Sequence, residues 1–106
     1  MANSIIKGGA VEIGSQSITD TETAIALSEN ITKYKFVEIF YKEGNVYRSH
    51  ALVSVNKLKT MHPLGIPFTA GGNAQMVLID YTDDTHLTGR TDSSSHSGTV
   101  KVYGVN

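Results

Sequence analysis

Hydrophobic and polar residues alternate over short stretches along most of the chain. The alternation is clearest at Ala10–Gly14 and at Thr99–Val105. Three further runs, at Tyr34–Lys42, Val46–Val55 and Gln75–Tyr81, are rich in β-branched and aromatic residues. Patterns of this kind and length are typical of β-strands. Weaker strands are predicted at 64–68 and 85–87.

The segments between these runs have the composition of turns. "EGN", "TAGGNA" and "TDSSSHSG" supply residues that accept positive φ or cap the backbone locally. Pro63 and Pro67 restrict Leu64–Ile66 to an edge strand or a loop. The segment Thr21–Asn30 is interpreted as a strand that ends near Leu27, with a single helical turn as the open alternative.

About seven short strands with frequent turns predict an all-β fold, an antiparallel β-sandwich or a barrel-like head domain with little or no helix. A chain of 106 residues fits one domain. We therefore predict a lead-in segment at residues 1–9 and a single β domain at residues 10–106. The chain has no cysteine, which excludes disulfides and thiolate chemistry and leaves the compartment open.

The segment from Lys33 to Val55 predicts a β-hairpin whose first arm is apolar on both faces. A two-residue turn at Gly44-Asn45 would place Val37 opposite Leu52 and Ile39 opposite His50. A three-residue turn would shift the pairs by one and leave both faces apolar. The second face needs a cover, either another copy of the chain or loops such as Met61–Phe68. The candidate residues for an oligomer interface or core are Tyr34, Phe36, Val37, Ile39, Phe40, Tyr41, Leu52 and Val53.

Candidate chemistry is sparse. No two of the four histidines have a metal-pair spacing, and no nucleophile motif or phosphate loop is present. We therefore predict no catalytic residue, no metal and no cofactor. Glu38 interrupts the apolar arm and is interpreted as a carboxylate paired with backbone donors or with Lys35, Arg48 or His50. A glycan hydrolase would need two converging acids, for which the available residues are Glu38, Asp80, Asp83 and Asp84.

The charge and the hydropathy of the chain limit the classes of partner that we expect it to bind. The net charge is −1 with no basic stripe, which disfavours nucleic acid, and no stretch approaches the ~20 apolar residues of a membrane span. Surface loops remain as the candidate binding elements. The residues that we expect there are Asn45, Tyr47, Arg48, Asn73, Asp83, Asp84, Arg90 and His96.

The stretch "IALSENITKYKFVEIFYKEGNVYRS" resembles a module near the C-terminal ends of tail fibre and baseplate proteins of phages and prophages of Gram-positive bacteria. The similarity consists of a Leu27-Ser28 start, the strand Val37–Tyr41, a polar turn, and the terminal strand "VKVYGVN" at 100–106. It covers about three-quarters of the chain and is a folding pattern without a catalytic signature.

The resemblance implies a virion structural protein, commonly trimeric, that contacts a host-surface glycan or protein and other virion proteins. Such a protein would lie in the virion, be made in the host cytoplasm and bind neither nucleic acid nor membrane. The alternatives are a monomeric carbohydrate-binding β-sandwich module using Tyr41, Tyr47 or Tyr81, a decoration protein of the capsid or virion, and a glycan depolymerase. Mass in solution discriminates between the oligomer and the monomer.

Overall fold

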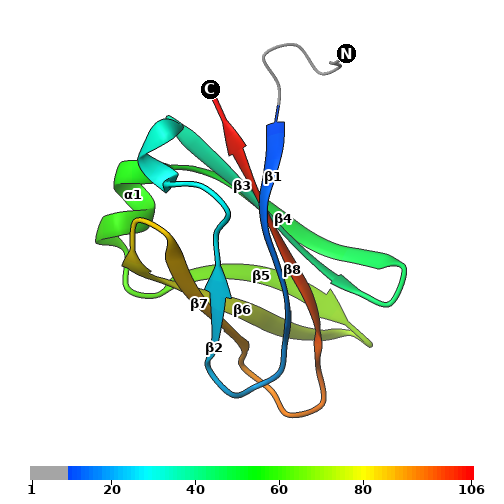
Figure 1. Ribbon diagram of the computed structural model, residues 1–106. Coiled ribbons are helices and arrows are strands. Elements are labelled where there is room, and N and C mark those ends of the chain that lie inside the picture. The colour runs from blue at the N-terminus through cyan, green and yellow to red at the C-terminus, as the bar shows by residue number, and fades with distance from the viewer. Residues whose placement is uncertain (1–9) are drawn as a thin grey trace.

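The computed structural model describes residues 10–106, and the predicted lead-in segment at residues 1–9 lies outside them. The described residues form eight strands in two four-stranded antiparallel sheets that face each other (Figure 1). The first sheet has the order β1 (Ala10–Ile18), β8 (Gly98–Val105), β3 (Phe36–Glu43) and β4 (Val46–Ser54). The second has the order β2 (Thr23–Ala26), β7 (His86–Thr91), β6 (Asn73–Asp83) and β5 (Leu64–Ala70). The predicted all-β sandwich is confirmed.

The chain crosses between the sheets four times, after β1, β2, β4 and β7. A 3₁₀ turn, η1 (Ile31–Lys33), follows β2. The segment Thr21–Asn30 therefore contains the predicted strand, and a helical turn begins directly after the segment. Asn30 caps this turn by accepting a hydrogen bond from the Thr32 amide at 2.9 Å. β5 lies at the edge of its sheet, as the two prolines predict.

A short helix, α1 (Val55–Thr60), connects β4 to β5 and was not predicted. Ser54 ends the strand and caps the helix, because its hydroxyl accepts a hydrogen bond from the Lys57 amide at 3.0 Å. Val55 and Leu58, three residues apart, are buried against the sandwich. The run Val46–Val55 has the pattern of a strand up to its last residue. The capping residue Ser54 is a local sign that the strand gives way to a helix.

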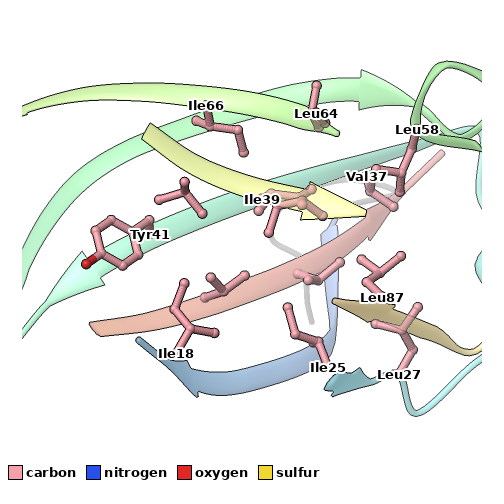
Figure 2. Close-up of a cluster of buried hydrophobic side chains, with 14 of the residues drawn as sticks. Ile18, Ile25, Leu27, Val37, Ile39, Tyr41, Leu58, Leu64, Ile66 and Leu87 are labelled. Atoms are coloured by element: carbon pink, nitrogen blue, oxygen red, sulfur yellow. The ribbon is translucent and has the colours of Figure 1, made fainter. Parts of the chain in front are cut away.

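The core lies between the two sheets, where inward side chains of both are almost fully buried (Figure 2). Val37 and Ile39 of β3 and Val77 and Ile79 of β6 have no exposed surface. Full burial of one such side chain stabilises the fold by about 1.5–3 kcal/mol before the entropy cost is counted. These positions alternate with outward residues along each strand, which is why the period of the sequence predicted them.

The register of the β3–β4 hairpin confirms the two-residue turn but corrects the pairs beyond it. Glu43 pairs with Val46 across Gly44-Asn45, and Gly44 has a φ of 59°. A bulge at Arg48 then shifts the ladder by one residue, so Ile39 faces Ala51 and not His50. A shift of one residue exchanges the faces of a strand. Leu52, predicted opposite Val37, therefore lies on the outer side of the sheet.

Candidate binding surface

The candidate site is the outer face of the first sheet, which points away from the second sheet. Apolar side chains remain exposed there: Phe36 keeps 40%, Tyr47 56% and Leu52 58% of its surface accessible. Their ladder neighbours on the same side are Val105 and Tyr103 of β8 and Ala10 and Glu12 of β1. This outer face corresponds to the second apolar face of the predicted hairpin. Its residues are Ala10, Glu12, Phe36, Glu38, Phe40, Lys42, Tyr47, His50, Leu52, Lys101, Tyr103 and Val105.

The structure divides the predicted interface-or-core residues into two sets. Val37, Ile39 and Tyr41 are core residues, and Tyr34 and Val53 pack against that core from its margin. Phe36, Phe40 and Leu52 lie on the outer face. The proposed intramolecular cover is wrong, because Leu64, Ile66 and Phe68 of the 61–68 segment point into the core from the opposite sheet.

Aromatic rings gather around Phe40 at the centre of the outer face. His50, its partner on β4, stacks on it with ring centroids 5.5 Å apart and planes 25° apart. Tyr47 and Tyr103 both meet Phe40 edge to face at 82°, with centroid distances of 5.8 Å and 5.5 Å. Lys42 places its ammonium 5.3 Å from the Tyr47 ring centroid. The outer face thus presents rings at right angles to one another.

A hollow of about 360 Å³ opens beside these rings, and its lining consists of Ala10, Glu38, Phe40, Tyr47 and Tyr103. Within residues 10–106 the Glu38 carboxylate makes neither an ion pair nor a side-chain hydrogen bond. The predicted partner Arg48 binds Glu43 instead. The Tyr103 hydroxyl donates to Glu12 at 3.2 Å, and burial together with this bond raises the pKa of Tyr103.

The predicted loop residues do not form one surface. The β3–β4 turn with Asn45 and the β5–β6 turn with Asn73 lie at one end of the sandwich (Figure 1). Asp83, the last residue of β6, and Asp84, in the β6–β7 turn, lie at the opposite end, where the Asp84 carbonyl accepts from the Ile31 amide at 2.8 Å. Tyr47 and Arg48 are not loop residues, since both belong to β4. Arg90 faces outward from β7, because that strand extends further than its weak pattern predicts.

His96 was predicted to face a ligand and instead turns inward. Its Nδ1 lies 2.9 Å from Glu43 Oε2, and its side chain is only 17% exposed. The buried Thr91 hydroxyl lies 2.9 Å and 2.8 Å from the carbonyl oxygens of Ser93 and His96, which shapes the serine-rich loop. His96 therefore joins the β7–β8 loop to the β3–β4 hairpin.

Glu43 is the centre of this contact. It also accepts hydrogen bonds from the Tyr41 hydroxyl at 2.6 Å and from Arg48 Nε at 3.1 Å. Burial alone would raise the pKa of Glu43, but the bonds from Tyr41, His96 and Arg48 outweigh burial and lower it. Burial and the bond to Glu43 place the pKa of Tyr41 well above its usual range. The cluster connects the β3–β4 hairpin to the β7–β8 loop, since all its donors bind the Glu43 carboxylate.

The acids considered for hydrolysis lie on different elements. Glu38 is on the first sheet, whereas Asp80, Asp83 and Asp84 belong to β6 and its turn in the second. Asp83 accepts from the Thr85 amide and lies 2.9 Å from His86, and Asp84 accepts from the Tyr81 hydroxyl. Among the described residues no group of three His, Asp or Glu side chains is arranged to hold a metal ion. No helix of residues 10–106 is long and apolar enough to cross a membrane.

Members of the outer face that were not among the predicted interface or binding residues include Ala10, Glu12, His50, Tyr103 and Val105. The signal for Tyr103 was present, because the terminal strand alternates buried Val100 and Val102 with Lys101 and Tyr103 on the opposite side. A tyrosine on the polar side of a half-buried strand marks an exposed contact surface. His50 was hidden by the unpredicted bulge.

No protein-family model matches this chain, and comparisons with curated proteins and with solved structures return no match. The resemblance to the phage and prophage modules therefore stays a prediction that rests on the hairpin and the terminal strand.

Proposed function

We propose that this chain is a non-enzymatic assembly and attachment domain of a virion, of the tail fibre or baseplate kind. In this proposal copies of the chain associate through the outer face of the first sheet, with a trimer as the favoured number. Other virion proteins and a host-surface glycan or protein are the remaining partners. The observation that carries the proposal is the exposed apolar surface of Phe36, Tyr47 and Leu52 on one continuous face.

An exposed apolar face of this kind marks an interaction surface more often than a free one. Leu52 is the sharpest case, because more than half of its side chain remains accessible. Covering one leucine stabilises an association by about 1.5–3 kcal/mol, and several neighbours contribute together. A closed ring of identical subunits would cover the same face on every copy.

A second candidate function is that of a monomeric carbohydrate-binding module. The hollow with its tyrosine walls favours it, and Tyr47 is well placed for this role. The other two tyrosines considered for a sugar groove are not. Tyr41 is in the core, and Tyr81 packs against the core with its hydroxyl bound to Asp84.

The test is the mass in solution, measured by light scattering across a dilution series. We expect particles larger than one chain and a loss of association in Leu52→Glu, by at least roughly tenfold in dissociation constant. Met76→Glu is the matched control, because Met76 is 42% exposed on the outer side of the second sheet. A monomer at every concentration would contradict the assembly proposal and favour the binding module. Equal effects of both variants would contradict the choice of face.

A further inference from the structure

We infer that the hollow on the outer face binds a methylated ammonium group, such as the trimethylammonium of a small organic cation. The inference rests on three aromatic rings and one carboxylate that line the same hollow. It does not depend on the association of copies or on the virion context. It names a ligand chemistry that can be tested directly.

The rings of Tyr47 and Tyr103 are steeply inclined to the ring of Phe40, on which His50 also stacks. Tyr47 and Tyr103 each stand at 82° to Phe40, so the three planes do not form one flat platform. Rings at right angles can present their electron-rich faces to a single rounded group from several sides. Quaternary and methylated ammonium groups are recognised in this way, because the ring quadrupole attracts their diffuse positive charge. A pyranose, by contrast, stacks best on a flat exposed ring.

The charge of the hollow points to the same ligand. Glu38 is the only ionisable carboxylate in a lining that otherwise consists of three rings and Ala10. A carboxylate beside apolar surface costs free energy unless a counter-charge accompanies it. The nearby Lys101 is directed to Glu12, with its Nζ 3.5 Å from the carboxylate, and Lys42 lies at the Tyr47 ring. Neither lysine forms an ion pair with Glu38.

A bare metal ion fits less well, because the hollow offers one carboxylate and no further anionic ligand. A sugar would need several donors and acceptors around its ring. Here the Tyr103 hydroxyl is already directed to Glu12, which leaves few groups to bind hydroxyls. A methylated ammonium satisfies the carboxylate by charge and the rings by contact.

The experiment is an NMR titration of the full chain with choline, in parallel with its neutral carbon analogue, in which a tert-butyl group replaces the trimethylammonium group. Expected are saturable shifts of Tyr47 and Tyr103 signals with choline, and binding of the neutral analogue weaker by at least about tenfold. The titration is repeated on Leu52→Glu. If copies of the chain cover the hollow, this variant should leave the hollow accessible and intact, since Leu52 does not line it.

Three variants complete the test. Glu38→Gln should weaken choline binding by about tenfold, whereas Glu22→Gln, in the connection between β1 and β2, should leave it unchanged. Tyr47→Phe keeps the ring and should retain binding, and Tyr47→Leu should lose it. Equal affinity for choline and the neutral analogue, or no effect of Glu38→Gln, would overturn the inference. Saturable binding of an oligosaccharide but not of choline would overturn it in favour of a sugar site, with the assembly proposal unaffected.

Discussion

Glu43 offers the sharpest test of how the hairpin is tied to the rest of the sandwich. Tyr41 is 1% exposed, so its hydroxyl needs the Glu43 acceptor at 2.6 Å. In Glu43→Ala this hydroxyl is left without a partner, which costs about 1–3 kcal/mol. The contacts to Arg48 and His96 lie nearer the surface and add less than about 1 kcal/mol each. We therefore expect a loss of about 2–4 kcal/mol in the free energy of unfolding.

The assay is urea unfolding followed by far-UV circular dichroism at neutral pH. A double-mutant cycle with Tyr41→Phe isolates the hydroxyl, because that variant removes the donor and keeps the ring. If the unpaired hydroxyl carries most of the cost, Glu43→Ala should be markedly less harmful in the Tyr41→Phe background. A loss below about 0.5 kcal/mol in Glu43→Ala, the range of an ordinary surface substitution, would refute the reasoning.

The pH dependence supplies an independent check on the same residue. The folded pKa of Glu43 lies below its ordinary value of 4.5, so near that pH the unfolded chain binds more protons. The contribution of Glu43 is thus present above pH 4.5 and is lost as the pH falls through the folded pKa. The stability difference between the wild type and Glu43→Gln should accordingly shrink on acidification. A difference that stays constant from neutral pH to well below 4.5 would contradict the assignment.

Two further predictions concern a glycine packed against the β3–β4 hairpin and the ionisation of Tyr41. Gly98→Ala should prevent stable folding, since an added Cβ would lie 2.2 Å from the Lys42 carbonyl oxygen; Gly65→Ala meets only a flexible methionine end and should unfold at nearly the wild-type urea concentration. Tyr41 should also contribute a fall in stability above pH 10 of up to ~1.4 kcal/mol per pH unit, because its folded pKa is raised and the unfolded tyrosine ionises first. Tyr34, Tyr81 and Tyr103, whose pKa values are raised as well, add to the slope of the whole protein. Tyr41→Phe should reduce this slope by the contribution of Tyr41, as urea unfolding at several alkaline pH values would show.

The sequence predicted the strands because the sandwich has one dominant period. Inward residues alternate with outward ones, and the turn at Gly44-Asn45 is local chemistry that two residues determine. The bulge at Arg48 was not predicted, because the alternation along the strand does not mark it. Arg48 turns back to Glu43, whose other partners include His96 from a loop 53 residues further along the chain. No pattern within one strand reports such a contact.

The helix α1 and the inward orientation of the His96 side chain were not predicted from the sequence, for related reasons. Val55 ends a run of strand-forming residues, and the change to helix is marked only by the Ser54 cap and by the spacing of three residues between Val55 and Leu58. A histidine in a serine-rich loop has the composition of a surface residue. Its burial depends on a carboxylate from β3, which the fold brings beside it. Of the predicted binding residues, Tyr47 alone lines the hollow.

A comparison of two interior strands shows that folding alone does not require the outer face of the first sheet to be apolar. β7 lies between β2 and β6, and its outward residues His86, Thr88 and Arg90 are polar, as a solvated face allows. β3 lies between β8 and β4, yet its outward residues include Phe36 and Phe40, which alternate with the charged Glu38 and Lys42.

Both strands bury their inward residues completely enough to hold the core, so the outward rings of β3 add little to the sandwich itself. Association of copies accounts for exposed Phe36 and Leu52. It does not account for the Glu38 carboxylate on the same face, since burying an unpaired charge weakens an interface. Glu38 instead fits a small cation, which supplies the missing charge and leaves the rings in contact. We therefore propose two roles for this face. Its apolar margin serves the association of copies, and the hollow within it binds a small cation.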